Sequence, residues 1–466
     1  MGLATMSPRN VTARSERVAV RVKEIQKNES FSLEKLSLQD KLTLQGKFMG
    51  IEEKRLDMQV EPANPFRPGA GHMPLYLAGR EAEKNEFRKL LKQNVILDNL
   101  VLTGLRGVGK TVLLDTLKPI AINDGWLWVG TDLTEATRLS EQNIAVRLIA
   151  DLSVVTSGIE LGRHETRKIG FSAASGADAT GEPQTLTFEV LSSIYNHTPG
   201  LVADKLKATL EKAWEYIKAK VGPKGLIFAY DEAQNMSDRS HKEQYPLSLM
   251  LDVFQSLQKK GVPMMLALAG LPTLFPRLVE ARTFAERMFR VVFLDRLDEG
   301  ASREAIRKPI QQSACSFPIE EPLIASIIQV SGGYPYFIQF ICREVYDAAL
   351  QLHRDGKPLV VSIADITRKL DTDFFAGRWA RATDRQRELL RVVAHLDNCD
   401  EEFTVQEVVE KSKEMLQNSF GSSHVNQMFG TLSSAGLIYK NRHGKYSFAV
   451  PLPGQFIMRQ EVGRIA

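Results

Sequence analysis

A glycine-rich stretch near residue 105 limits what this 466-residue chain can fold into more than any other feature. It follows a short apolar run that begins at Asn99, reads Gly104-Leu-Arg-Gly-Val-Gly-Lys-Thr111, and precedes a run that can continue as a helix. This is the spacing of a phosphate-binding P-loop, in which glycines let successive backbone N–H groups point at a phosphate. The helix that follows presents its positive N-terminal end to the same anion. The pattern therefore predicts a strand, a phosphate-binding loop and a helix.

The residues at the end of this loop carry specific chemistry. Lys110 is expected to neutralise charge on the β- and γ-phosphates, and the Thr111 hydroxyl to hold Mg²⁺. A strand–turn–helix connection with chance glycines is the alternative, but it does not account for Lys-Thr at this spacing. ATP and Mg²⁺ are therefore the expected cofactors. The predicted nucleotide-binding residues of the loop are Gly104, Leu105, Arg106, Gly107, Val108, Gly109, Lys110, Thr111 and Val112.

A second apolar run ends in two carboxylates. Residues 225–230, Gly-Leu-Ile-Phe-Ala-Tyr, have no charged side chain, as in a strand covered on both faces, and Asp231 and Glu232 follow directly. We expect Asp231 to act in the Mg²⁺ shell and Glu232 to polarise the attacking water. The alternative is that these acids only cap a helix after the strand. The P-loop upstream favours the second half of a nucleotide site.

Composition and charge are those of an ordinary globular chain. It is 43% hydrophobic and 25% charged, and its formal net charge of +4 does not by itself require a nucleic-acid partner. Cys315, Cys342 and Cys399 lie far apart, which argues against a disulfide framework or a zinc site and fits a reducing compartment. No apolar run is long enough to cross a bilayer, and the polar N-terminus lacks the pattern of a secretory signal. We expect a cytoplasmic protein without a membrane partner.

Alternating strand and helix patterns predict an α/β fold with a parallel sheet and crossover helices. Two further strands are expected, one from Trp126 and one from Val262, and a Gly- and Ser-rich stretch at 158–187 predicts a flexible insertion. Helices are expected over 141–155, 201–221, 247–260, 303–311, 322–330 and 336–352. The predicted domains are an N-terminal arm at 1–62, helical or partly disordered, a nucleotide-binding α/β domain at 63–294, a helical lid at 295–375 and a further domain at 376–466.

The last hundred residues predict a winged helix, since three helices over 385–395, 405–413 and 423–436 precede a hairpin over 437–448. The third helix, which would lie in the major groove of DNA, has no lysine or arginine, although its polar residues suit contacts with bases. Basic residues of the hairpin suit contacts with phosphates; they are Lys440, Arg442, His443 and Lys445. Double-stranded DNA is thus one candidate partner, and docking of a protein is the alternative.

These motifs resemble those of the AAA+ ATPases, particularly the origin-recognition-type clade, with similar chains among transposition regulators and signal-transduction (STAND-like) ATPases. The resemblance spans about residues 64–460. The family implies a P-loop NTPase sheet with a helical lid, and often a C-terminal winged helix. The stretches that carry the resemblance are the P-loop, Ala229-Tyr-Asp-Glu-Ala-Gln234, Leu77-Ala-Gly-Arg-Glu81, Ala269-Gly-Leu-Pro-Thr273 and Gly332-Gly-Tyr-Pro335.

The resemblance also implies roles for residues outside the P-loop. Gly79 and Arg80 would lie in the segment that lines the adenine pocket, and Pro335 beside the base; a plain loop before a helix is the alternative for Gly79 and Arg80. In the family, an arginine after the fourth strand inserts into the neighbouring subunit's site. Arg287 matches that position best, and a solvated helix face is the alternative. The arginines in this stretch are Arg282, Arg287 and Arg290.

Two positions depart from the family pattern. Residues 269–270 are Ala-Gly where a polar residue usually senses the γ-phosphate, and Thr273 lies near that position. Directly after Pro335, where many relatives carry an arginine that reaches the nucleotide, this chain has Tyr336. Arg343, further along the same predicted helix, is the candidate substitute.

These patterns favour a slow, Mg²⁺-dependent ATPase that couples nucleotide state to conformational change or assembly. Its expected partners include a second copy of the chain, through self-association, and DNA. Its expected catalytic residues are Lys110, Glu232 and Arg287. The alternative is a signalling or defence switch with low turnover, whose winged helix docks an unknown protein partner. A metabolic phosphotransferase would not account for the Asp-Glu pair, the long helical lid and the winged helix.

Overall fold

The computed structural model describes residues 63–466 apart from 131, 134–139, 162–183, 239–241, 314–318, 359, 443 and 466. The residues from Ala63 onward form one compact unit. The predicted N-terminal arm, 1–62, lies outside the described residues, and so does most of the predicted insertion at 158–187. Within the part of the chain that the structure describes, none of the helices is both long enough and apolar enough to cross a membrane.

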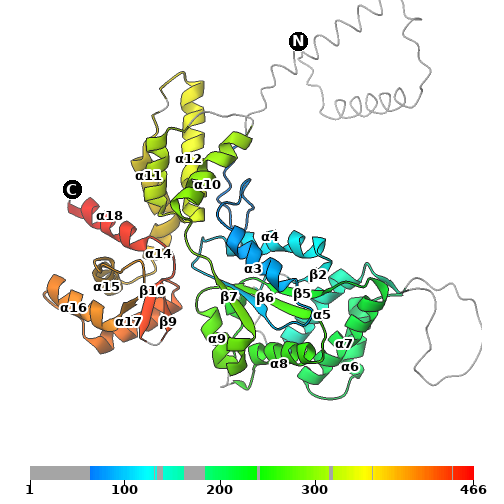
Figure 1. Ribbon diagram of the computed structural model, residues 1–466. Coiled ribbons are helices and arrows are strands. Elements are labelled where there is room, and N and C mark those ends of the chain that lie inside the picture. Colours follow the sequence, from blue (N-terminus) through cyan, green and yellow to red (C-terminus); the bar gives the residue numbers. More distant parts are fainter. Residues whose placement is uncertain are drawn as a thin grey trace, which may run out of the picture. The chain divides into compact units, whose positions relative to one another are not determined.

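A five-stranded parallel sheet lies at the centre of the first half of this unit, in the order β2-β5-β6-β1-β7 (Figure 1). Its strands are β1 (Asn99–Thr103), β2 (Trp126–Val129), β5 (Gly225–Tyr230), β6 (Met264–Gly270) and β7 (Phe289–Phe293). The P-loop strand β1 is therefore flanked by β6 and β7. The sequence predicted all of these strands except β7, where exposed Arg290 interrupts the apolar run. The predicted α/β fold class is confirmed.

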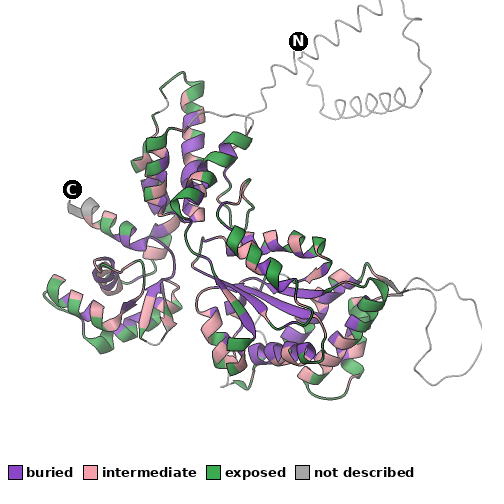
Figure 2. Cartoon of the chain, in the orientation of Figure 1, coloured by how far each residue is buried: buried purple, intermediate pink, exposed green. Residues whose placement is uncertain are grey.

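Helices cover both faces of the sheet, because successive side chains of a strand point to opposite faces. Leu100 and Leu102 of β1 face a cluster that includes α3 (Glu81–Leu90) and α4 (Lys110–Asn123). Val101, between them, faces the other cluster. That cluster includes α5 (Glu141–Thr156), α6 (Phe188–His197), α7 (Val202–Lys220), α8 (Pro246–Lys259) and α9 (Leu274–Ala281). Figure 2 shows the strands buried between the two layers. The sequence did not predict α6 or α9.

Helices follow the sheet, as predicted. They are α10 (Glu299–Gln312), α11 (Glu321–Ser331), α12 (Pro335–Arg354) and α13 (Ile363–Leu370), and we refer to them as the lid. The sequence did not predict α13. From α13 the chain continues through a π-helical turn, Asp371–Ala376, into the short helix α14 (Gly377–Trp379). The domain boundary predicted at 375/376 falls inside this helical segment and stays a prediction, as does the boundary at 294/295, just after β7.

The last part of the chain, the C-terminal module, combines helices with a small antiparallel sheet in the order β8-β10-β9. It comprises α15 (Asp384–Ala394), β8 (Phe403–Thr404), α16 (Val405–Met415), α17 (Ser422–Ser434), β9 (Ile438–Arg442), β10 (Lys445–Phe448) and α18 (Pro453–Ile465). The three predicted helices and the hairpin are present, while β8 and α18 were not predicted. The assignment of this module as a winged helix stays a prediction.

Candidate nucleotide-binding site

The P-loop turns from β1 into α4 with a backbone that requires glycine, as Gly109 and Gly104 illustrate. Gly109 caps the helix at φ +91°, in the left-handed region that other residues rarely adopt. At Gly104, a Cβ atom would lie 2.4 Å from the Leu294 carbonyl oxygen, just past the end of β7. The loop is therefore held close to the chain that leaves the carboxyl end of β7.

Lys110 is buried at the first position of α4, with only 8% of its surface exposed. Its ammonium group donates hydrogen bonds to the carbonyl oxygens of Gly104 (3.0 Å) and Leu105 (2.9 Å). Burial lowers the pKa of Lys110 to about 8, although the negative charges of Glu232 and Asp231 act to raise it. A cation that is desolvated in this way gains from a bound anion, which is the role predicted for the lysine of a P-loop.

Thr111 and Asp231 bring the two predicted halves of the site into contact. The Thr111 hydroxyl donates a hydrogen bond to the buried Asp231 carboxylate, whose other oxygen accepts from the backbone N–H of Glu232 at 2.7 Å. Asp132 lies beside Asp231 through an isolated parallel β-bridge. The pKa of Asp115 is raised by partial burial and by the charges of Asp132 and Asp231, which shows that negative charge accumulates here.

This donor set fits Mg²⁺, which prefers hydroxyl and carboxylate oxygens and is usually held by one or two carboxylates together with phosphate oxygens. Within the described ranges, no group of three or more His, Cys, Asp or Glu side chains is arranged to hold a metal ion without further ligands. Thr111 and Asp231 would therefore suit a Mg²⁺ ion that takes its further ligands from phosphate and water.

Glu232 is held by a residue that the sequence analysis did not single out. Its backbone lies in the left-handed region at φ +52°, and its carboxylate accepts a hydrogen bond from the Gln234 side-chain amide. The amide oxygen of Gln234 accepts in turn from the backbone N–H of Leu271, at 3.0 Å. A Cβ atom at Gly270 would lie 2.6 Å from this oxygen, so glycine leaves room for Gln234. Thr273, the candidate sensor, does not line the cavity described next.

A cavity of about 900 Å³ lies over the P-loop. It is bordered by the loop, by residues 67–80, by the start of α12 and by residues 373–378. The predicted site residues that line it are Arg80, Arg106, Gly107, Val108, Gly109, Lys110, Thr111, Val112, Glu232 and Pro335. The predicted residues that do not line it are Gly79, Gly104, Leu105, Asp231 and Arg287. Asp231 and Gly104 instead contact lining residues, as described above.

Arg80 joins the P-loop to the end of the sheet. Its guanidinium donates to the carbonyl oxygens of Val108 (3.0 Å) and Asp295 (2.7 Å), and it pairs with Glu83 at 3.1 Å. Gly79, at φ +63°, packs closely against α10, because a Cβ atom there would lie 2.6 Å from the Ala301 Cβ. Gly79 therefore sets how closely the lid approaches, and Arg80 borders the cavity with a side chain already engaged by the protein.

The lid contacts the P-loop directly at the start of α12. The backbone N–H of Tyr336 donates to the Gly107 carbonyl oxygen at 3.1 Å, and Pro335 lines the cavity beside it. Arg343, the predicted substitute for the missing lid arginine, is exposed and does not line the cavity. The arginine that does reach the cavity from beyond the lid is Arg378 in α14, which the sequence analysis missed because it belongs to no recognised motif.

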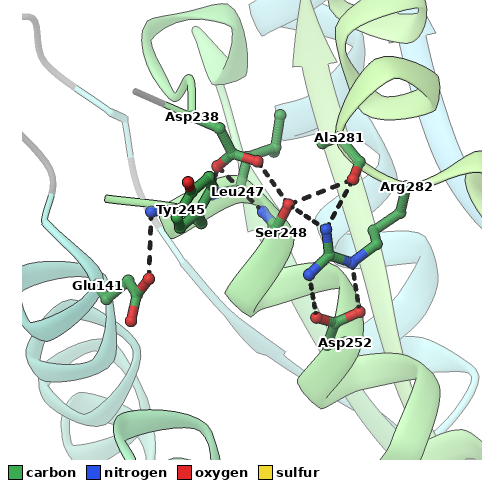
Figure 3. Close-up of polar contacts among 8 residues, drawn as sticks. All are labelled: Glu141, Asp238, Tyr245, Leu247, Ser248, Asp252, Ala281 and Arg282. Carbon is green, nitrogen blue, oxygen red and sulfur yellow. Dashed lines mark hydrogen bonds and ion pairs between the residues drawn. The ribbon is translucent and has the colours of Figure 1, made fainter. Parts of the chain in front are cut away.

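The three arginines of residues 282–290, before and within β7, differ in their contacts. Arg282 forms a two-pronged ion pair with Asp252 (2.8 and 2.7 Å) and also donates to the Ser248 hydroxyl at 2.8 Å, within the polar network of Figure 3. Arg290 pairs with Glu86 at 2.9 Å. Arg287, at the end of the short 3-10 helix Thr283–Arg287, is exposed, and no described residue forms a hydrogen bond or ion pair with its side chain.

Arg287 lies at the end of the sheet that is opposite to the P-loop of the same molecule. Residue 289 begins β7 opposite Asn99, and Phe293 lies opposite Thr103 at the other end. Arg287 thus lies at the amino edge of the sheet, whereas the P-loop follows the carboxyl edge. Four residues of strand separate the two edges by about 13 Å. An arginine at this place is available to a second molecule and not to its own nucleotide site.

Comparisons with known proteins gave one family match and several similar solved structures. Residues 372–457 match a family described as a domain of unknown function (DUF8462). This match begins within the π-helical turn and therefore includes Arg378 as well as most of the C-terminal module. Among curated protein sequences, none matches this chain.

Similar solved structures include the Walker-type ATPase PABY2304 of Pyrococcus abyssi, 15% identical, with a TM-score of 0.49 over 82% of this chain and 96% of that one. The ADP form of the ORC2 protein of Aeropyrum pernix is 14% identical, with a TM-score of 0.46 over 84% and 97%. The ORC1 protein of the same organism, solved in complex with DNA, is 14% identical, with a TM-score of 0.41 over 84% and 96%. By fold, the chain described here is a P-loop NTPase whose parallel sheet is followed by a helical lid.

Proposed function

We propose that this protein binds ATP together with Mg²⁺ and hydrolyses it slowly. The proposal rests on one observation. A buried lysine, a Thr–Asp contact and a second carboxylate, which follows β5, come together at one P-loop. These groups lie more than a hundred residues apart in the sequence, so their contact is not a consequence of local chain geometry. It supplies the parts that phosphoryl transfer to water needs.

Each group has a role that follows from its surroundings. The Lys110 ammonium group, desolvated and already directed into the loop, neutralises charge on the β- and γ-phosphates. Thr111 and Asp231 would hold Mg²⁺, which neutralises phosphate charge and fixes its geometry when bound. Glu232, held in place by Gln234 at the border of the cavity, orients and deprotonates the attacking water. Arg80 keeps the loop and the end of β7 together while the cavity fills.

Hydrolysis is proposed to need a second molecule. The start of α12 brings Tyr336, and not an arginine, onto the P-loop, and Arg287 lies at the opposite edge of the sheet. An arginine supplied by a neighbour stabilises the charge that develops in phosphoryl transfer. Self-association would therefore place Arg287 of one copy at the nucleotide of the next, which makes turnover depend on assembly.

Nucleotide binding is tested by calorimetry on the full chain, with wild type beside Lys110→Ala and with Mg²⁺ present or withheld. Wild type should bind ATP, more tightly with Mg²⁺, and Lys110→Ala should lose most of that affinity because the main phosphate-binding charge is gone. Arg88→Ala, which removes an exposed positive charge on α3 outside the cavity, serves as the control and should bind normally. Equal affinity of wild type and Lys110→Ala would refute the proposal.

DNA contact and docking of a protein remain two proposals for the C-terminal module. Lys440 in β9 is exposed, whereas α17, which would read a major groove, has no lysine or arginine. A DNA-binding role would thus depend on the hairpin and would show a shallow salt dependence. Titration of double-stranded DNA at several salt concentrations, with and without ATP, separates the proposals, since a protein-docking module would show no saturable binding to DNA.

A further inference from the structure

The helical segment between the lid and the C-terminal module contributes one of its faces to the nucleotide cavity. Asp373 and Phe374 of the π-helical turn, and Arg378 of α14, all line that cavity. Phe374 and Arg378 are four residues apart and therefore lie on the same side of a helical segment. π-helical turns are rare, and many occur at functional sites. The segment is therefore a candidate part of the nucleotide site that no sequence motif indicated.

Arg378 is half-buried and has donors to spare. Its guanidinium carbon lies 4.1 Å from the centre of the Phe374 ring, and the group donates one hydrogen bond to the Phe374 carbonyl oxygen. These two contacts fix the direction of the side chain. A guanidinium has five N–H donors, and among the described residues that carbonyl is its one hydrogen-bond acceptor. Most of its hydrogen-bonding capacity remains open to a ligand.

A second arginine faces the same cavity. Arg106, in the P-loop, is exposed and lines the cavity with Arg378. Burial lowers the pKa of Arg378, and the nearby charge of Arg106 lowers it further. Asp373 also lines the cavity, yet over the described ranges neither arginine forms an ion pair with it or with any other carboxylate. Two cations placed in this way repel each other until an anion binds between them.

The P-loop indicates which part of a nucleotide that anion would be. The lysine of a P-loop reaches the β- and γ-phosphates, and here the Lys110 ammonium group lies at the carbonyl oxygens of Gly104 and Leu105. The γ-phosphate end of the cavity is therefore next to the first turn of the loop, where Arg106 follows Leu105 in the chain. Glu232, the proposed base for the attacking water, borders the same cavity.

We infer that Arg378, together with Arg106, binds the γ-phosphate of ATP in the same molecule. The inference rests on the proposed function and deepens it. Arg378 supplies, from beyond the lid, a positive charge that the lid itself does not carry, since Tyr336 contacts the P-loop at the start of α12. ATP and ADP are then distinguished at Arg378, because ADP lacks the phosphate that this arginine binds.

Other side chains of the same segment hold the last helix of the chain. Asp371 forms a two-pronged ion pair with Arg459 of α18 (2.8 and 2.5 Å), and the Phe375 ring stacks on the Phe456 ring with centroids 5.1 Å apart and planes 16° apart. Loss of the γ-phosphate would therefore leave Arg378 without its ligand, and Arg378 belongs to the segment that contacts α18. The C-terminal module is thus connected to the nucleotide through less than two turns of helix.

The test compares Arg378→Met with wild type in the full chain, by calorimetry with Mg²⁺ and either ADP or a non-hydrolysable ATP analogue. Methionine keeps a long stem against Phe374 and removes the charge. A charge-assisted hydrogen bond to phosphate predicts a loss of about tenfold to a hundredfold in affinity for the analogue. Affinity for ADP should change by less than about threefold, and Arg378→Lys should recover part of the loss.

Arg381→Met is the matched control. Arg381 is an exposed arginine one turn further along and does not line the cavity, so both affinities should stay at the wild-type level. Equal losses for ADP and the analogue in Arg378→Met, or no loss for either, would overturn the inference while leaving the proposed function intact. Failure of wild type to bind either nucleotide would instead refute the proposed function. If Arg378→Met does not fold, judged by circular dichroism, Arg106→Met must show the same selective loss.

Discussion

The two edges of the central sheet use their polar side chains in different ways. At the carboxyl edge, Lys110, Thr111, Asp231 and Glu232 contact one another or their neighbours around a cavity. In the stretch that enters β7 from the amino edge, Arg282 and Arg290 are occupied by ion pairs within the molecule, and Arg287 is exposed. The carboxyl edge thus gathers polar groups around the cavity of the proposed nucleotide site, whereas the amino edge presents the exposed Arg287, which is proposed to act on a second molecule.

The largest expected effect comes from removing the Arg287 side chain at the amino edge of the sheet. Arg287→Ala should lower ATP turnover by about a thousandfold, the range of an arginine supplied by a neighbour, and leave ATP affinity unchanged. Phosphate release per molecule, measured over a dilution series, should rise with protein concentration in wild type and stay near zero in the variant. Arg290→Ala, which removes an exposed arginine paired with Glu86, is the control.

A mixing experiment sharpens the same comparison. Equal amounts of Arg287→Ala and Glu232→Gln should together be more active than either alone, because some interfaces then combine an intact Glu232 with an intact Arg287. Activity per molecule that does not depend on concentration, together with no gain on mixing, would show that the chain works as a self-contained switch.

A change at the carboxyl edge should have the next largest effect. Glu232→Gln keeps the shape and loses the base, so turnover should fall by about a hundredfold or more while ATP binding persists. Glu243→Gln is a matched control, since Glu243 has the same φ of +52° but is exposed and does not line the cavity. Turnover of Glu232→Gln equal to that of wild type would remove this residue from the mechanism.

Gln234 is expected to act through Glu232 as a positioning residue. Gln234→Leu removes the hydrogen bond to the Glu232 carboxylate and should lower kcat by about tenfold, a value typical of residues that orient a catalytic group, with little change in KM. In the double variant with Glu232→Gln, the second substitution should cost nothing further, because both act on the same step. Full additivity of the two effects would assign Gln234 a merely structural role.

The smallest effect concerns pH and belongs to Lys110. In the free protein its pKa is about 8, and bound phosphate favours the charged form, so binding above pH 8 requires uptake of a proton. ATP affinity should therefore fall by about fourfold between pH 7 and pH 8.5, in proportion to the charged fraction of the free protein. The residual binding of Lys110→Gln should be flat over this window, and an equal slope in that variant would contradict the assignment.

What the sequence predicted well lies in short contiguous stretches. The P-loop and the Asp231–Glu232 pair each fit within eight residues, and their chemistry depends on residue type and spacing that can be read directly. Three of the four helices of the lid, α10, α11 and α12, were also predicted, whereas α13 was not. Strand β7 was missed because, as an edge strand, it carries an exposed arginine, Arg290, which interrupts the apolar pattern of a buried strand.

What the sequence did not predict depends on contacts between distant segments. Gln234 matters because Gly270 leaves room for its amide beside Leu271, which no local pattern reveals. Arg378 lies more than 260 residues after the P-loop, in a π-helical turn and short helix without a motif, and only the packing of α12 and that segment brings it to the cavity. The roles of Gly79 and Arg80 stay predictions, since Arg80 already bonds two backbone carbonyls.

The two hydrogen bonds that Lys110 makes to its own loop affect how a nucleotide is captured. A lysine side chain that is free to rotate loses about 1.5–2 kcal/mol of conformational entropy when it is fixed. Here that entropy is already lost before any ligand arrives, because the Gly104 and Leu105 carbonyl oxygens hold the ammonium group in place. A phosphate therefore binds a preorganised cation. Its affinity depends on the ammonium group exchanging the two carbonyl acceptors for phosphate oxygens, and no mobile side chain has to be ordered.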